Sequence, residues 1–163
     1  MTTSHVDKIQ AFMVAAGQYC PDTYIFDSNN LTEENIKTLK LRLSLITEEV
    51  EELFEGVLAS KQFNVFKIQF QVIQQMIKLL DQTDIDYDRV AVADALTDID
   101  YINGGTAVAL KIPLEACFDA VHENNMTKID PVTGKCLKNE QGKIIKPEGY
   151  ISVSLDDVLK EHM

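Results

Sequence analysis

Cysteine is scarce in this sequence of 163 residues, and its three copies are far apart. Cys20, Cys117 and Cys136 form no CxxC pair, so a structural zinc site is not expected. An odd number of cysteines without a secretion signal also argues against a disulfide framework. We therefore expect free thiols.

Long hydrophobic runs are absent as well. No apolar stretch reaches the roughly 18 residues that a membrane-spanning helix needs. The first eight residues, MTTSHVDK, contain no apolar signal region. We expect a soluble cytoplasmic protein with no membrane partner.

Positive charge is in deficit. Lysine and arginine number 15 against 26 acidic residues, which gives a formal net charge of -11. A general nucleic-acid binder usually carries a basic face, so no nucleic-acid partner is expected. A polyanionic ligand would approach an acidic site here only if metal ions neutralised that site.

Helical periodicity dominates the rest of the chain. Between residues 32 and 59 the apolar positions alternate at spacings of three and four, which predicts an amphipathic helix. Further helices are expected at about residues 5–19, 63–80, 87–110 and 114–125, with a final short one at 155–162. The expected fold is a single all-α domain over residues 1–163, a four- to five-helix bundle. Residues 1–30 form its N-terminal helix and loop, and residues 126–163 an irregular C-terminal arm with turn sequences or a small hairpin.

The helix expected at 63–80 has two apolar stripes. One runs from Phe63 through Phe70 to Leu80, and the other from Val65 through Leu79. A helix that is apolar on two sides must be covered on two sides, which favours a partner subunit. A central helix covered within its own chain is the alternative.

Acidic residues cluster on two of these helices. Glu48, Glu49 and Glu52 share one sector of the helix at 32–59, because each residue advances about 100°. Asp94 and Asp98 form a second pair, one turn apart, on the helix at 87–110. If these helices pack side by side, the carboxylates converge, and oxygen ligands of this kind suit Mg²⁺ or Mn²⁺.

Other interpretations of the cluster stay open. Acidic runs are common on solvated helix faces. A di-iron bundle would usually need Glu-x-x-His pairs, which His5, His122 and His162 do not form. No Gly-x-x-x-x-Gly-Lys phosphate loop exists, and no Ser–His or Cys–His pair indicates a nucleophile.

Several motifs in order resemble a known superfamily. The run Glu48-Glu49-x-x-Glu52, followed by an acidic helix, resembles the EExxE…ExxD pattern of the all-α nucleotide pyrophosphohydrolases, which include MazG and the dimeric dUTPases. Residues 92–108 (VADALTDIDYINGGTAV), 121–128 (VHENNMTK) and 142–146 (GKIIK) are similar to the phosphoribosyl-ATP pyrophosphohydrolase-like branch. The resemblance covers most of residues 35 to 150.

This resemblance implies an α-helical bundle, a homodimer or a dimer of dimers, that cleaves a nucleotide between its α and β phosphates. It implies Glu48 and Glu52 as metal ligands, and Glu49 as a ligand or as the base that orients the attacking water. The second motif departs from ExxD, because Ala91 or Ala95 stands where its glutamate would be, depending on the placement. We expect Asp94 and Asp98 to act together in its place, and the number of metal ions stays open.

The resemblance also implies substrate contacts near the end of the chain. Asn125 and Lys128 match a pair at a helix end near the substrate, and Lys143 and Lys146 lie on the arm, where they could close over a triphosphate. A helix C-cap, a solvated lysine and a solvated turn are the alternatives. The expected function is a Mg²⁺-dependent nucleoside triphosphate pyrophosphohydrolase. The alternatives are a phosphoribosyl-ATP pyrophosphohydrolase and a non-catalytic bundle that binds nucleotide or metal.

Overall fold

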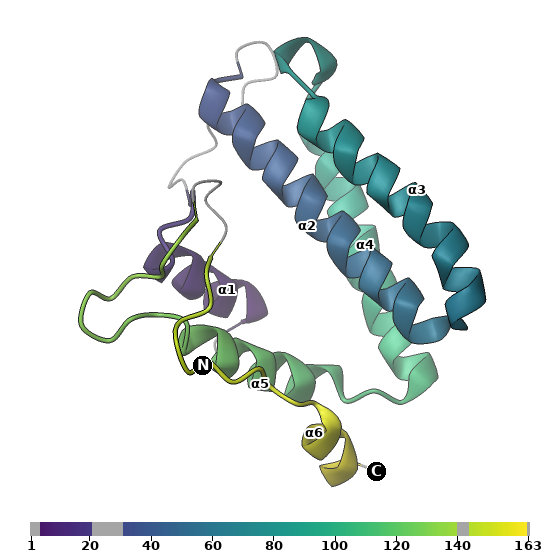
Figure 1. The fold of residues 1–163 in the computed structure, drawn as a ribbon, viewed down its shortest axis with the longest axis vertical. Coiled ribbons are helices and arrows are strands. Elements are labelled where there is room, and N and C mark those ends of the chain that lie inside the picture. Colours follow the sequence, from purple (N-terminus) through teal and green to yellow (C-terminus); the bar gives the residue numbers. More distant parts are fainter. Residues whose placement is uncertain (1–3, 21–30, 140–143, 163) are drawn as a thin grey trace. The chain divides into compact units, whose positions relative to one another are not determined.

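The computed structural model of the chain describes residues 4–20, 31–139 and 144–162 (Figure 1). Within these residues there are six α-helices, a short 3₁₀ turn and no strand, so the predicted all-α class is confirmed. The chain divides into two compact units. One comprises Tyr24–Ala93, and the other comprises Met1–Thr23 with Asp94–Met163. The single domain stays a prediction.

The first of these units is a helical hairpin of α2 (Glu33–Val57) and α3 (Ser60–Leu79), which lie side by side in Figure 1. Thr32 caps α2, because its side chain accepts a hydrogen bond from the backbone N–H of Asn35 and Asn35 reciprocates. The hairpin is closed by aromatic packing, with the ring of Phe54 centred 5.2 Å from Phe66 and 5.5 Å from Phe70. The predicted long helix at 32–59 is confirmed.

Polar contacts fix the register of this hairpin. The Gln74 amide of α3 donates to the Ser44 carbonyl of α2 at 2.8 Å and its oxygen accepts from the Ser44 hydroxyl at 2.6 Å. Lys40 donates to the carbonyls of Lys78 and Leu80, at 2.8 and 2.6 Å. These carbonyls end α3, where a cation offsets the negative end of the helix dipole. The turn η1 (Gln82–Asp84) follows, capped by the side chain of Asp81.

The two apolar stripes of α3 have different surroundings. Phe63 and Ile77 of the first stripe are buried. The second stripe is exposed along its length: Val65, Ile68, Val72, Met76 and Leu79. The expectation that α3 is apolar on two sides is therefore confirmed, while the partner subunit stays a prediction.

The other unit is built on α5 (Leu114–Met126), which Pro113 precedes, as predicted. The helix α4 (Arg89–Leu110) is divided between the units, and its residues from Asp94 onward belong to this one. The helix α1 (His5–Ala15) packs on α5. The His5 ring stacks on Phe118 at 3.8 Å, and Lys8 pairs with Asp119 at 2.6 Å. The helix α6 (Asp156–Glu161) also packs on α5.

The predicted end of the first helix at Tyr19 is wrong, because α1 ends at Ala15. Gly17 takes a φ of 59°, a left-handed conformation that suits glycine. The N–H of Gln18 then bonds to the Met13 carbonyl at 2.8 Å, and the N–H of Gly17 to the Val14 carbonyl at 2.9 Å. This is a Schellman motif, which stops a helix whatever apolar residues follow.

The predicted irregular arm is confirmed between α5 and α6. Two isolated antiparallel bridges, Ile129 with Cys136 and Lys138 with Ile144, connect its segments where a sheet would otherwise do so. The three cysteines are free, as expected. No helix in the described part of the chain is both long enough and apolar enough to cross a membrane.

Candidate functional site

The predicted glutamates lie on the second half of α2. The helix runs unbroken through this stretch, so Glu48 and Glu52 project one turn apart, with Glu49 beside them. Glu48 is half-buried, whereas Glu49 and Glu52 are exposed. The local geometry on which the prediction depended, three carboxylates in one helical sector, is therefore present.

The second pair lies on α4, where Asp94 and Asp98 are again one helical turn apart and exposed. These aspartates belong to the unit that contains α5, and the glutamates belong to the hairpin unit. Among residues 4–20, 31–139 and 144–162, no three Asp, Glu, His or Cys side chains gather as a metal-binding group. The magnesium site thus stays a prediction, supported by its donor chemistry of carboxylate oxygens alone.

The substrate-contact residues at the end of α5 do come together. The Lys128 ammonium donates to the Asn125 side-chain oxygen at 2.7 Å. Lys128 is half-buried, and the helix C-cap is Thr127, not Asn125. The C-cap alternative for Asn125 is therefore wrong, and the Lys128 ammonium is bonded to Asn125 rather than surrounded by solvent alone. Substrate binding by the pair stays a prediction.

Tyr150 is the site residue that the sequence did not indicate. The ammonium of Lys128 lies 5.4 Å from the centre of its ring, and that of Lys146 lies 5.3 Å from the same centre. Two predicted contacts from different segments therefore share one aromatic ring. Lys143 lies outside the described residues. A lone tyrosine in a polar arm has no periodicity or motif, so no sequence signal could have found it.

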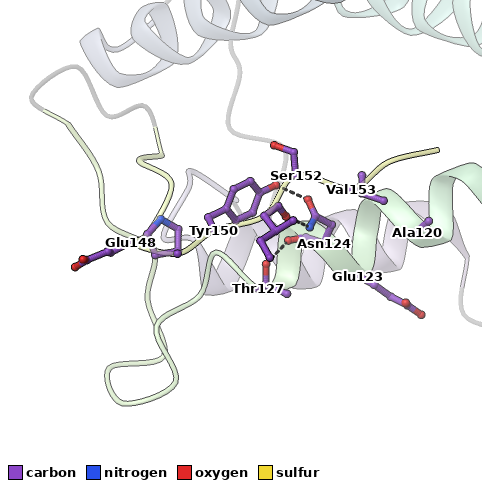
Figure 2. Close-up of a pocket in the computed structure, with 11 residues that line it drawn as sticks. Ala120, Glu123, Asn124, Thr127, Glu148, Tyr150, Ser152 and Val153 are labelled. Atoms are coloured by element: carbon purple, nitrogen blue, oxygen red, sulfur yellow. Dashed lines mark hydrogen bonds between the residues drawn. The ribbon is translucent and has the colours of Figure 1, made fainter. Parts of the chain in front are cut away.

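A pocket of about 590 Å³ lies between α5 and arm residues 147–153 (Figure 2). The Tyr150 hydroxyl donates to the side-chain oxygen of Asn124 across it, and the Asn124 amide donates to the Ile151 carbonyl at 2.8 Å. Thr127 donates to the Asn124 carbonyl at 2.7 Å. The two bonds of the Asn124 side chain dock the arm on α5.

Cys136 is the cysteine of the C-terminal arm. Burial raises the pKa of the Cys136 thiol above its usual value of 9.0, although the charges of Lys128 and Lys138 act in the opposite direction. Cys136 therefore stays protonated near neutral pH, and a thiol reacts as its thiolate. That no cysteine is a catalytic nucleophile stays a prediction.

A family model described as phosphoribosyl-ATP pyrophosphohydrolase matches residues 23–125. The matched segment contains α2 to α4, α5 except its last residue, and all five predicted carboxylate ligands with Asn125. Lys128, Lys146 and Tyr150 lie beyond its end. No curated protein and no solved structure matches the chain.

Proposed function

Because this chain belongs to the phosphoribosyl-ATP pyrophosphohydrolase family, a branch of the MazG-like all-α superfamily, we propose that it cleaves a nucleoside triphosphate between the α and β phosphates. Membership makes the chain a nucleotide pyrophosphohydrolase, a hydrolase of phosphorus-containing acid anhydrides. The proposed products are a nucleoside monophosphate and pyrophosphate. The match over residues 23–125 is the observation that carries the proposal.

We assign the metal-binding role to five carboxylates: Glu48, Glu49, Glu52, Asp94 and Asp98. Mg²⁺, or Mn²⁺ in its place, supplies Lewis acidity toward phosphate oxygens and lowers the pKa of water when it is bound. The spacing of Glu48 and Glu52 on α2 supports this assignment, because ligands one turn apart reach the same ion.

The proposed chemistry of the protein is a proton transfer at Glu49. The oxygen of the attacking water forms a bond to one phosphorus as the bond from the α–β bridging oxygen to that phosphorus breaks. The Glu49 carboxylate takes a proton from that water, and the bridging oxygen leaves with the other phosphate product. Asn125 orients the nucleotide, and Lys128, Lys143 and Lys146 offset charge on the leaving phosphates.

Phosphoribosyl-ATP is the second candidate substrate. The description of the matching family favours it, and it has the same α–β phosphoanhydride bond as the nucleoside triphosphates. The proposed residue roles are the same for both candidate substrates. Discrimination between them would therefore depend on the protein residues that contact the base and ribose.

A substrate panel tests the proposal. Pyrophosphate release is measured with Mg²⁺ from each common NTP and dNTP and from phosphoribosyl-ATP, with the wild type and with Glu49→Gln. We expect release from at least one substrate, and a fall in kcat of about 100-fold or more in the variant, the usual range for loss of a general base. Release from none of them would overturn the proposal. Unchanged turnover in Glu49→Gln would remove Glu49 from the chemistry.

A further inference from the structure

Tyr150 makes two kinds of contact. Its hydroxyl connects the arm to α5, and its ring lies near the ammonium groups of two lysines. The hydroxyl contacts Asn124 near the end of α5, so the ring is held at the side of that helix (Figure 2). Lys128 approaches this ring from the residues after α5, and Lys146 from the arm. The ring is therefore the point where these segments meet.

Among residues 4–20, 31–139 and 144–162, neither the Lys128 nor the Lys146 ammonium group forms an ion pair with a carboxylate. Two cations near one ring repel each other, and the attraction of each to the π face offsets part of that repulsion. In a protein with a net charge of -11, such a pair is a local site for an anion.

The pocket beside Tyr150 is a less suitable place for a ligand. Its central amide, Asn124, has its oxygen on the Tyr150 hydroxyl and its nitrogen on the Ile151 carbonyl. Glu123 and Glu148 are also among its lining residues, and their negative charge is unfavourable for a phosphate there. The pocket therefore docks the arm, and an anion would approach the lysines instead.

We propose that Tyr150 is a positioning residue whose ring holds the ammonium groups of Lys128 and Lys146 together as a clamp for a di- or triphosphate group. This inference rests on the proposed function for its physiological ligand, the phosphate chain of the nucleotide. The clamp itself needs neither the metal site nor turnover. The bonds from these two ammonium groups to phosphate are charge-assisted, which makes them stronger than bonds between neutral groups.

The test measures binding of inorganic tripolyphosphate to the full chain in EDTA by titration calorimetry. Tyr150→Leu removes the ring, whereas Tyr150→Phe keeps the ring and loses only the bond to Asn124. We expect the dissociation constant to rise roughly fivefold in Tyr150→Leu and to stay within about twofold in Tyr150→Phe. Lys128→Ala and Lys146→Ala should each weaken binding about tenfold. Tyr101→Leu, at an exposed tyrosine of α4, is the matched control and should bind as the wild type does.

Steady-state kinetics gives the second measurement. With a nucleotide that the wild type cleaves, Tyr150→Leu should raise KM roughly fivefold and leave kcat within about twofold, since the clamp acts in binding. Equal weakening in Tyr150→Phe and Tyr150→Leu would overturn the inference, because the tyrosine would then only dock the arm. Wild-type protein that does not bind tripolyphosphate would overturn it too. Tyr150-dependent binding without turnover of any nucleotide would refute the proposed function and leave the clamp standing.

Discussion

At the scale of single residues, the acidic side chains on α2 differ in their position along the helix. Glu48 and Glu52 share a line along the helix with Glu49 beside them, whereas the exposed Glu34 lies about 27 Å from Glu52 along the axis, at a rise of about 1.5 Å per residue. All four carry the same charge, so a substitution that removes one charge tests position alone. This makes Glu34 a control for the proposed ligands.

We expect Glu52→Gln to lower kcat/KM by about 100-fold or more, because loss of a metal ligand removes several kcal/mol of transition-state stabilisation. Glu34→Gln should leave kcat/KM within about twofold of the wild type, since its charge lies more than a Debye length of about 10 Å from the proposed ligands. Pyrophosphate release at saturating and limiting Mg²⁺ checks both variants. Equal losses in the two variants would show that overall acidity, not ligation, matters.

The pair of Lys8 and Asp119 joins α1 to α5 and titrates at low pH. The hydrogen bond from Lys8 holds the pKa of the Asp119 carboxyl below its usual 3.8, and the nearby charges of Lys8, His5 and His122 add to this. A carboxyl with a lowered pKa in the folded state stabilises the fold above pH 3.8, and this contribution is lost as pH falls through the folded-state pKa.

Asp119→Asn should therefore unfold at a lower temperature than the wild type near neutral pH, because it removes the charge that Lys8 binds. The difference in Tm should shrink as the pH falls below 3.8. Thermal melts followed by circular dichroism across this pH range provide the measurement. A Tm difference that is constant with pH would contradict an electrostatic origin.

At the scale of elements, α2 depends on how it begins. Thr32 and Asn35 bond reciprocally, and Asn35 is buried at 2% exposure, so this capping box is a fixed part of the hairpin. The box at the start of α1, between Ser4 and Asp7, is exposed. Capping should therefore matter more for α2 than for α1.

Thr32→Ala should reduce the free energy of unfolding by about 0.5–2 kcal/mol, the usual range for loss of an N-cap. Thr32→Ser keeps the capping oxygen, and serine is at least as good an N-cap as threonine, so its free energy of unfolding should stay within about 0.5 kcal/mol of the wild type. Ser4→Ala should cost less than Thr32→Ala. Urea unfolding of the three variants tests the order, and a larger loss in Ser4→Ala would reverse our view of which cap matters.

At the scale of the whole molecule, the exposed second stripe of α3 is the reason to expect a homodimer or homotetramer. Ile68 is 64% exposed and Leu79 80% exposed, and both belong to one continuous apolar face. Removing such a face from water releases about 25 cal/mol for each Å² buried. A second copy of the chain is the partner we propose for it.

Ile68→Asp should shift the protein toward the monomer in sedimentation velocity, because a charge on this face opposes burial. Gln71→Asp adds the same charge at an exposed polar position of α3 and should leave the assembly intact. An assembly that persists in Ile68→Asp would place the interface elsewhere. A wild type that is monomeric at all concentrations would refute the oligomer.

Much of the fold could be predicted because helix periodicity is a local property. The spacing of apolar residues in α2 and the proline before α5 were sufficient to place both helices. The end of α1 was missed because the left-handed Gly17 closes a Schellman motif, and the apolar pattern carries no signal for that backbone conformation. Lys128 was predicted as a substrate contact, but its pairing with Asn125 needed coordinates.

By itself, the sequence determined the all-α class, the row of carboxylates on α2 and the family, since each is written in short-range spacing or in ordered motifs. Only the tertiary structure decided that Phe63 and Ile77 are the buried side of α3 and that Lys128 and Lys146 share the ring of Tyr150. The physical reason is the same in both cases. A periodic pattern shows that a face needs a neighbour, but the neighbour is chosen by packing between segments that are distant in the chain.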